Sequence, residues 1–318
     1  MNIAAADWQP YRLPLNRPWQ TSRGTLFERC GRLLRLQTTD GLTGWGDAAP
    51  LPEFGISEAA ATAFADETAH LDLAAQKAGL PLHAWLSGEV PILSIRTNAN
   101  LGAIDTVDHV ALKSAVDAGF SVVKIKVGRQ ALADEITYLQ QLTRDLPPTL
   151  SFRLDANQAW QFADARAFIE ACAVLPIEGL EEPLSDPDPV LLAKLQSFAA
   201  FPLAIDESIN LLDTHFFRHP PVRRIIIKPA RHGGLLASIE LALRARASSI
   251  ETIITSSLES SCGLLACAQL AAAVAPDSIH GLATADWFAQ DTGMAPTIIG
   301  GRLQLPGTPG LGFQPVTR

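Results

Sequence analysis

The sequence predicts an α/β protein whose larger part is a modified TIM barrel, (β/α)7β, preceded by an N-terminal α+β capping domain. Two observations lead to this fold class. Five short apolar segments each end in charged residues, and stretches with helical periodicity separate them. The five segments are VVKIKVG (122–128), FRLDANQ (152–158), GLEEP (179–183), LAIDES (203–208) and RIIIKP (224–229).

The charged ends of these segments follow one another at similar intervals. Lys126, Asp155, Glu181, Asp206 and Lys228 are separated by 29, 26, 25 and 22 residues. One strand, one returning helix and two short loops take up about that much chain. Barrels carry active groups at the C-terminal ends of several strands, so this pattern favours a barrel. An open doubly wound sheet would place its ligand chemistry after a Gly-rich first turn, and the chain contains neither G-x-G-x-x-G nor G-x-x-x-x-G-K-[ST].

Helical stretches complete the alternation of strand and helix. Their apolar residues recur at the three- and four-residue intervals of an amphipathic helix. They are 131–142, 163–172, 189–198 and 235–247. A run of small apolar residues at 262–275 is too short to span a bilayer and predicts a buried barrel helix.

The N-terminal part of the chain has a different pattern. Apolar runs at 32–36 and 42–45 flank Asp40-Gly41, a strong hairpin turn signal. Ser57 then begins a long helical stretch that ends near Gly79. These signals predict the α+β capping domain.

The domain ranges follow from this change of pattern. The 318 residues suffice for a barrel of roughly 200–250 residues and a smaller domain. The C-terminal tail is rich in Gly and Pro, and we expect it to wrap back over the N-terminal domain. The expected parts are a capping domain at 1–90, a barrel domain at 91–302 that opens with a strand at 91–98, and a tail at 303–318 that completes the capping domain.

Composition limits the classes of function. A net charge of −8 and a pI near 5.4 argue against nucleic acid and anionic membranes as partners. The first residues lack a basic region followed by an apolar one, and the four cysteines have no C-x-x-C spacing, so we expect a cytoplasmic protein with reduced thiols. His215 and His219 lack the glutamate of a zinc motif. We expect a monomer or small homo-oligomer with a small carboxylate substrate.

Three of the charged ends are carboxylates. Asp155, Glu181 and Asp206, brought to one barrel mouth, would raise one another's pKa unless a cation lay between them. Mg²⁺ suits such a site best, with Mn²⁺ as a substitute, because it accepts a few carboxylates and completes its coordination with water and substrate oxygens. We therefore predict that these three residues bind a metal ion.

The other two charged ends are lysines. Residues i and i+2 of a strand share a face, so Lys124 and Lys126 both point inward, and Arg153 and Asn157 share a face with Asp155. A partly buried lysine beside other cations has a lowered pKa and can act as a base. Metal and lysine together suit removal of a proton next to a carboxylate, where the enediolate needs stabilisation. Lys228 would supply a second cation.

These segments, in this order and spacing, resemble the muconate-lactonizing subgroup of the enolase superfamily. That superfamily's use of a Lys or His base with Mg²⁺ is a known example of pKa tuning. The resemblance implies Mg²⁺ ligation by Asp155, Glu181 and Asp206. It further implies that Lys126 is the acid/base, that Lys228 lies on the opposite face of the enediolate, and that Lys124 keeps the pKa of Lys126 low. Glu182 and Glu207 would point outward or lie behind the ligands.

Within the subgroup, the run Thr255–Ser261 and the stretch Pro50–Pro52 resemble the o-succinylbenzoate synthase family. This resemblance implies a lyase of menaquinone biosynthesis that dehydrates 2-succinyl-6-hydroxy-2,4-cyclohexadiene-1-carboxylate to 2-succinylbenzoate. Ala283–Asp286 lacks the first aspartate of the Asp-x-Asp motif in dipeptide epimerases. The expected substrate contacts are Arg153, Asn157, Ser256, Ser257 and Gly263, with free N–H groups near the helix that follows Ser261 suited to a carboxylate.

Several alternatives stay open from the sequence. The same groups would serve an N-succinylamino acid racemase or a dipeptide epimerase. Lys228 could be the nucleophile of a Schiff-base aldolase, or the barrel could bind an acidic metabolite without catalysis. Arg153 would be either a substrate contact or an ion-pair partner of a metal carboxylate. The segment Pro18–Gly24 suggests a mobile lid, and Glu53 departs from the glycine common in the family after Pro-Leu-Pro.

Overall fold

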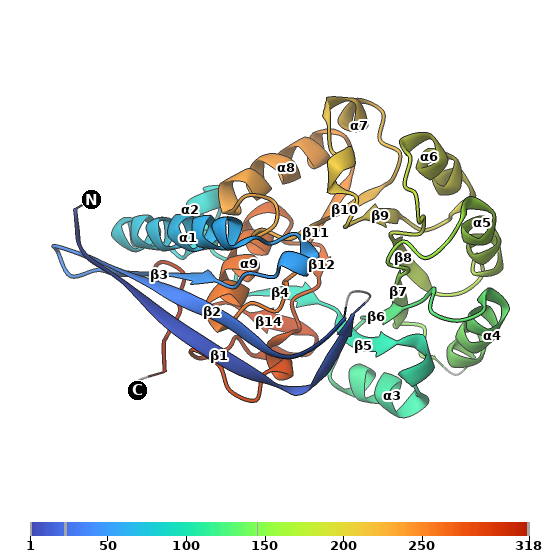
Figure 1. Ribbon diagram of the computed structural model, residues 1–318, viewed down its shortest axis with the longest axis horizontal. Helices are drawn as coiled ribbons and strands as arrows, with labels where there is room; N and C mark the ends of the chain where they lie inside the picture. The colour runs from blue at the N-terminus through green and yellow to red at the C-terminus, as the bar shows by residue number, and fades with distance from the viewer. Residues whose placement is uncertain (1, 22–23, 145, 317–318) are drawn as a thin grey trace.

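The computed structural model describes residues 2–21, 24–144 and 146–316. The chain begins with an antiparallel sheet of order β1-β2-β3, made of β1 (Ile3–Thr21), β2 (Gly24–Thr38) and β3 (Thr43–Ala48). The predicted turn at Asp40-Gly41 is confirmed, with Gly41 at φ 90° and Thr38 N bonded to Leu42 O. In Figure 1 this sheet (blue) forms one end of the molecule and both termini lie beside it.

Helix α1 (Glu58–Ala78) packs on this sheet, followed by α2 (Leu82–Ser87). The predicted ends are confirmed, because the Ser57 side chain accepts a bond from Ala60 N and Gly79 closes the helix in the left-handed conformation. Gly44 and Gly46 lie so close to the backbone of α1 that a Cβ atom would collide with it. Glycine at these two positions therefore allows the helix to lie directly on the sheet.

The barrel contains a seven-stranded parallel sheet in chain order, and this confirms the predicted fold class. Its strands are β5 (Ala99–Ala103), β6 (Val122–Lys126), β7 (Ser151–Asp155), β8 (Ile177–Glu181), β9 (Leu203–Ile205), β10 (Arg224–Ile227) and β11 (Glu251–Ile254). The sheet closes through β12 (Ile279–His280), which pairs with β4 (Ser94–Thr97), and through the bridge from Thr255 to Gly281.

Where one strand was expected at 91–98, the structure has two short strands, β4 and β5, in different sheets. β4 ends at Thr97, and β5 continues in the barrel sheet after Asn98. β4 belongs to a second sheet with β12, β13 (Ile298–Ile299) and β14 (Arg302–Gln304). The chain passes from one sheet to the other at Asn98, a change of partner that residue pattern alone does not reveal.

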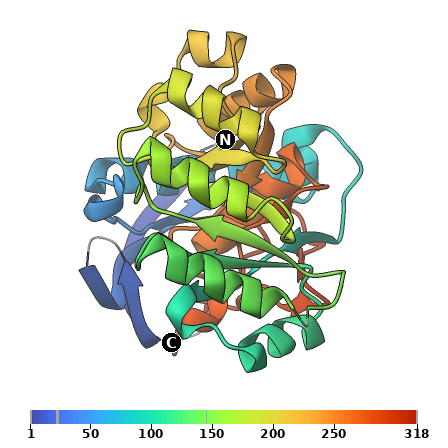
Figure 2. The same ribbon diagram turned by 90° about the vertical axis from the view of Figure 1, so that its right-hand side faces the viewer.

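Helices cover the outside of the barrel. Those at the four predicted stretches are confirmed to within one residue, whereas α3 and the short α7 were not predicted. In Figure 2, α4, α5 and α6 (green to yellow) lie next to one another over the strands. The helices are α3 (His109–Asp117), α4 (Leu132–Thr143), α5 (Phe162–Ala171), α6 (Pro189–Phe198), α7 (Thr214–Arg218), α8 (Leu235–Ala247) and α9 (Ser261–Val274), with short 3₁₀ turns η1 (Pro52–Phe54), η2 (Ile104–Thr106), η3 (Ile209–Leu211) and η4 (Ala285–Trp287).

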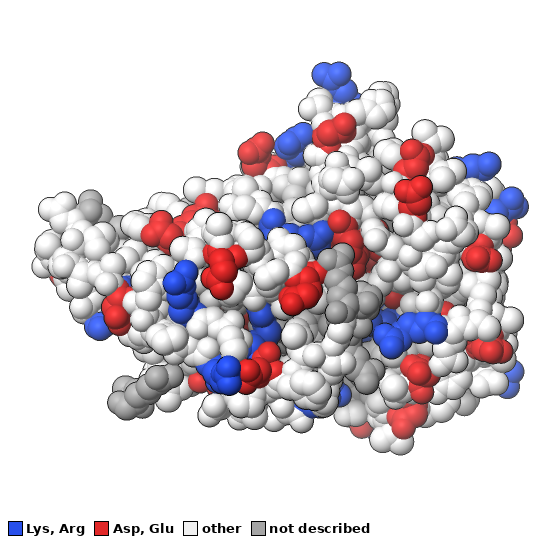
Figure 3. Space-filling view, in the orientation of Figure 1, with Lys and Arg blue, Asp and Glu red and all other residues white. Residues whose placement is uncertain are grey.

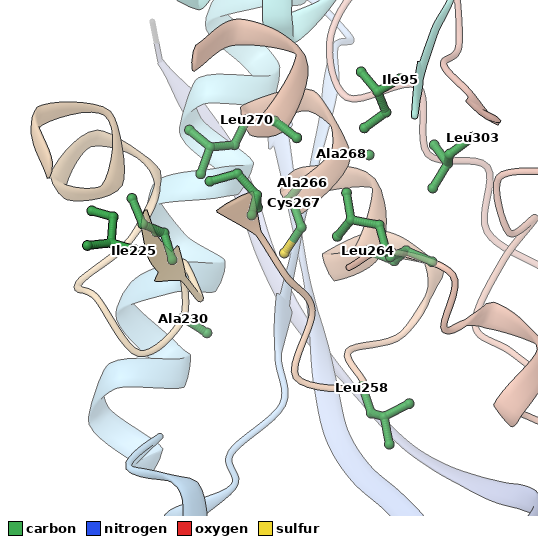
Figure 4. Close-up of a cluster of buried hydrophobic side chains, with 14 of the residues drawn as sticks. Ile95, Ile225, Ala230, Leu258, Leu264, Ala266, Cys267, Ala268, Leu270 and Leu303 are labelled. Atoms are coloured by element: carbon green, nitrogen blue, oxygen red, sulfur yellow. The ribbon is translucent and has the colours of Figure 1, made fainter. Parts of the chain in front are cut away.

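Helix α9 is buried along nearly its whole length, as the run of small apolar residues predicted. Figure 4 shows Leu264 and Cys267 of α9 among side chains from other elements, including Ile95, Ile225 and Leu303. No helix in the described ranges is long and apolar enough to cross a membrane. On the face shown in Figure 3, acidic and basic side chains are interspersed rather than gathered by sign.

The tail packs against the N-terminal elements. Leu311 N donates to Asp72 of α1 at 2.7 Å, Gly310 O accepts from Leu82 N at 2.8 Å, and Phe313 meets Trp45 edge-on with ring centroids 5.5 Å apart. These contacts agree with a tail that wraps back, and the domain ranges themselves remain a prediction.

Candidate active site

The candidate active site lies where the strands β6 to β10 end. Lys126, Asp155 and Glu181 are register partners across β6, β7 and β8, so they lie at one level of the barrel. Glu181 is only 1% exposed and lies behind the other charged groups. Five of the predicted charged residues line one pocket, namely Lys124, Lys126, Asp155, Asp206 and Lys228.

Each carboxylate has a cationic partner in this structure. Lys124 Nζ lies 3.0 Å from Asp155 Oδ2 and also contacts Glu181 Oε2. Lys228 Nζ contacts Asp206 Oδ2, and Arg231 lies 3.1 Å from Asp206 Oδ1. These ion pairs offset the repulsion among the like charges of the three carboxylates.

The pairing shifts the pKa of both partners. Burial opposes ionisation of Asp206, but Lys228 and Arg231 outweigh it and lower its pKa to about 2. Burial likewise opposes the charge of Lys124, while Asp155 and Glu181 outweigh it and raise the pKa of that lysine above its usual range. Both groups are thus charged at neutral pH.

Lys126 has a different environment on the same strand. Burial lowers its pKa, the charges of Lys124 and Lys228 lower it further, and Asp155 opposes the change. A lysine with a lowered pKa is neutral at a lower pH and is then able to accept a proton. Lys126 is thus the lysine of this pocket that is suited to act as a base.

As it stands, no group of three or more Asp, Glu, His or Cys side chains within residues 2–21, 24–144 and 146–316 is arranged to hold a metal ion. The ammonium groups of Lys124 and Lys228 bind the carboxylates instead. The chemistry of the donors nevertheless fits a hard divalent cation, because Glu181 Oε1 and Glu207 Oε2 are buried carboxylate oxygens without a hydrogen-bond partner.

Glu207 and Glu182 differ from each other in position. Glu182 accepts bonds from Asp206 N at 2.6 Å and from Ser208 N at 2.8 Å, so it holds the loop after β9 behind the pocket. Glu207 lines the pocket, so it does not point outward. β9 ends at Ile205, so strand alternation no longer applies at residue 207.

Burial raises the pKa of Glu207 to about 7, and the neighbouring charges of Asp206 and Asp155 raise it in the same direction. Asn157 Nδ2 donates to Glu207 Oε1 at 2.9 Å and also lines the pocket, where the sequence predicted a substrate contact. A pair of polar side chains thus extends the site beyond the five predicted charged groups.

Arg153 and Gly263 do not line the pocket. Arg153 is fully buried and binds Glu178 through Nε and Nη2, both at 2.9 Å, and Ile279 O at 2.8 Å. Its partner is therefore Glu178, at the start of β8, rather than a predicted metal ligand. Gly263 lies in α9, where an added Cβ would meet Glu259 and Asp47.

The seventh-strand serines do reach the pocket. Ser256 Oγ lies 2.7 Å from Thr284 Oγ1, and the Oγ of Ser257 is buried without a partner. The N–H groups of Ser256 and Ser257, expected to be free, are bonded, because Ser257 N donates to Glu259 at 2.6 Å and Ser256 N to Gly281 O at 3.2 Å. The hydroxyl groups, and not these amides, are available to a ligand.

An apolar wall that the sequence did not predict borders the pocket. Trp19 and Phe54 stack with ring centroids 5.6 Å apart and planes at 19°. Leu51, Leu258 and Trp287 line the same pocket. The predicted lid lies only partly within the described residues, since Ser22-Arg23 fall outside them. Three segments singled out in the sequence contribute to this wall, namely the Pro-Leu-Pro stretch, the predicted lid with Trp19 and the run Thr255–Ser261 with Leu258.

The barrel with its charged mouth defines a class of protein. Residues 107–317, about two thirds of the chain, match the family described as enolase C-terminal domain-like. The chain belongs to this family, and the predicted resemblance to the enolase superfamily is confirmed.

Curated relatives extend the match over most of the chain. An o-succinylbenzoate synthase from Yersinia enterocolitica is 32% identical over 301 residues, 89% of this chain and 90% of its own. One from Edwardsiella ictaluri is 35% identical over 297 residues, 86% of this chain and 88% of its own. Both similarities cover more of the chain than residues 107–317 do.

Solved structures show the same fold at lower identity. The L-Ala-D/L-Glu epimerase from Bacillus subtilis superposes with a TM-score of 0.87 at 24% identity, over 98% of this chain and 99% of its own. A dipeptide epimerase from Cytophaga hutchinsonii, complexed with Mg and the dipeptide D-Ala-L-Val, gives 0.86 at 20% identity over 99% and 96%.

Proposed function

We propose that this protein is an enzyme with the activity of its curated relatives, a lyase that dehydrates 2-succinyl-6-hydroxy-2,4-cyclohexadiene-1-carboxylate to 2-succinylbenzoate. The observation that carries the proposal is the similarity to o-succinylbenzoate synthases over 86–89% of the chain. The pocket supports it, because a lysine with a lowered pKa lies beside three carboxylates at the barrel mouth.

Asp155, Glu181 and Asp206 would hold the metal ion, Mg²⁺ or in its place Mn²⁺. Support comes from the unpaired Glu181 Oε1 and from the oxygen-only donor set. When bound, the metal would supply positive charge to the substrate carboxylate and so stabilise the enediolate. Lys124, Lys228 and Arg231 would then share these carboxylates with the metal.

Lys126 would act twice. As a neutral amine it accepts the proton α to the ring carboxylate, and as an ammonium it donates that proton to the departing hydroxide, which leaves as water. Lys124 would hold the pKa of Lys126 low through like charge. Lys228 would lie on the other face of the substrate as a fixed cation, with no proton to transfer. Asn157, Ser256 and Ser257 would contact the substrate.

Racemisation of N-succinylamino acids, or epimerisation of dipeptides, is the second candidate. Epimerases share this fold, but at 20–24% identity they show the fold and not the activity. The eighth-strand segment supplies Ala283 and Thr284 to the pocket lining, and neither would hold a substrate ammonium group. We therefore rank dehydration first.

The deciding experiment offers the pure protein each substrate, with and without Mg²⁺. We expect loss of the cyclohexadiene acid and formation of the aromatic product only with the metal. Sustained racemisation without dehydration would reject the first candidate. A borohydride-trapped adduct on Lys228, with activity retained in EDTA, would instead indicate the aldolase.

The remaining predictions belong to this proposal. They are a role in menaquinone biosynthesis, a cytoplasmic location, a monomer or small homo-oligomer without nucleic-acid or membrane partners, and the domain ranges 1–90, 91–302 and 303–318.

A further inference from the structure

Two loops that lie far apart in the sequence contribute three side chains to the apolar wall of the pocket. Residues 49–56 follow β3 and contribute Leu51 and Phe54. Residues 255–260 connect β11 to α9 and contribute Leu258, which Figure 4 shows on this connection below α9. The wall therefore depends on how one loop is held against the other.

One buried side chain binds both loops. Arg29, on β2, is 3% exposed. Its Nε donates to Leu258 O at 3.0 Å, its Nη1 to Pro50 O at 2.8 Å and its Nη2 to Ala49 O at 2.9 Å. The planar guanidinium group reaches three carbonyl oxygens in fixed directions, which an ammonium group cannot do. Arg29 thus fixes the distance between the two loops.

The loop that contains Leu258 needs this support. Leu258 has a φ of 57°, a left-handed conformation that costs a non-glycine residue energy unless its surroundings hold it there. Asp47 of β3 binds the same loop two residues further on, where its Oδ2 accepts from Ser260 N and Ser260 Oγ, both at 2.9 Å. The capping sheet therefore holds a carbonyl and an amide of one strained turn.

We propose that Arg29 is a positioning residue that sets the apolar wall and so determines which non-reacting groups a carboxylate substrate of this enzyme can carry. The inference rests on the proposed function for the identity of the substrate, but the link between the two loops does not. Arg29 touches none of the charged groups at the strand ends. It acts through Leu51, Phe54 and Leu258, which would contact the substrate away from its reacting carbon.

The first test follows the loops themselves and needs no substrate. Arg29→Lys keeps the positive charge but loses the planar guanidinium group that binds three carbonyl oxygens. We therefore expect amide hydrogen exchange to become faster in both loops, 49–56 and 255–260. Arg32→Lys is the matched control on the same strand, because Arg32 binds Thr62 and the Trp8 ring, neither of which lines the pocket. If the folded Arg29→Lys protein exchanges the amide hydrogens of both loops as slowly as the wild type, the proposal is overturned.

The second test separates KM from kcat. For Arg29→Lys we expect KM to rise about tenfold and kcat to change by less than about threefold, because the wall contributes to binding in the ground state and the transition state alike. A fall in kcat at unchanged KM, or no change in either, would overturn the positioning role.

Failure of the two proposals is distinguishable. If the wild-type enzyme racemises N-succinylamino acids and does not dehydrate the cyclohexadiene acid, the proposed function fails and KM is compared on the racemase substrate instead. If Arg29→Lys does not fold, Leu258→Gly tests the wall itself, because it keeps the carbonyl that Arg29 binds. Glycine adopts the positive φ unaided and removes the wall side chain, so KM should rise while kcat is kept, and an unchanged KM would refute the inference.

Discussion

The buried ion network around Glu178 allows a prediction whose magnitude follows from the structure. Glu178 binds Arg153 at 2.9 Å and Arg224 at 2.5 Å, and the two arginine side chains are 1% and 3% exposed. Burial opposes ionisation of Glu178, but the two arginines outweigh it and lower the pKa from 4.5 to about 2. Glu178→Gln resembles the protonated carboxyl group, so the variant should lose the stability that this pKa difference represents.

A fall of about 2.5 in pKa, at about 1.4 kcal/mol for each whole pKa step, corresponds to about 3 kcal/mol. Breaking a buried ion pair by removing one partner costs about 3–5 kcal/mol in other proteins, so the two figures agree. Because the folded-state pKa is the lower one, the contribution is complete above about pH 4.5 and disappears as the pH falls toward about 2.

Urea unfolding of the wild type and of Glu178→Gln at pH 7 measures this loss by linear extrapolation. The matched control is Glu170→Gln, because Glu170 pairs with Arg166 at 2.8 Å on the surface with side chains about half exposed. We expect the control to change the free energy of unfolding by less than about 0.5 kcal/mol. A Glu178→Gln variant as stable as this control, or a difference that does not shrink toward acid pH, would refute the reasoning.

The remaining predictions concern the active site. Lys126→Ala should lower kcat/KM by at least about a thousandfold with an unchanged melting temperature, and retained activity would exclude Lys126 as the base. In the wild type, kcat/KM should rise with pH and level off below the usual lysine pKa, because burial and neighbouring cations lower the pKa of Lys126. Lys124→Met removes one of those cations, so the inflection should move to higher pH, and an unmoved inflection would contradict the role of Lys124. Removing metal with EDTA should abolish activity, and adding Mg²⁺ should restore it and raise the melting temperature, whereas Asp206→Asn should show no such rise.

The charged strand ends were predictable because their pattern is local. Each apolar strand that ends in Lys126, Asp155 or Glu181 is recognisable from its own few residues. The interval between successive strands reflects the length of one returning helix. In parallel strands of one barrel, such residues necessarily meet at the same mouth. The fold class and the position of these side chains therefore follow from the order of residues alone.

Arg153 shows where local reasoning stops. Alternation along β7 correctly places it inside the barrel, but its level relative to the mouth depends on its neighbours. Glu178, which also accepts a bond from Arg224, binds Arg153 away from the pocket. For Glu207 the same reasoning excluded a residue that does line the pocket. Glu207 lies beyond the end of β9, where alternation no longer applies.

The sequence by itself determined the barrel, the capping sheet and the charged groups that meet at the strand ends, since periodicity and spacing are properties of neighbouring residues. Only the tertiary structure decided which partners those charges have, that Arg153 lies outside the pocket and that Glu207 lines it. It also decided the apolar wall, two loops of which Arg29 holds together. Each of these depends on contacts between segments far apart in the chain, such as the 229 residues that separate Arg29 from Leu258.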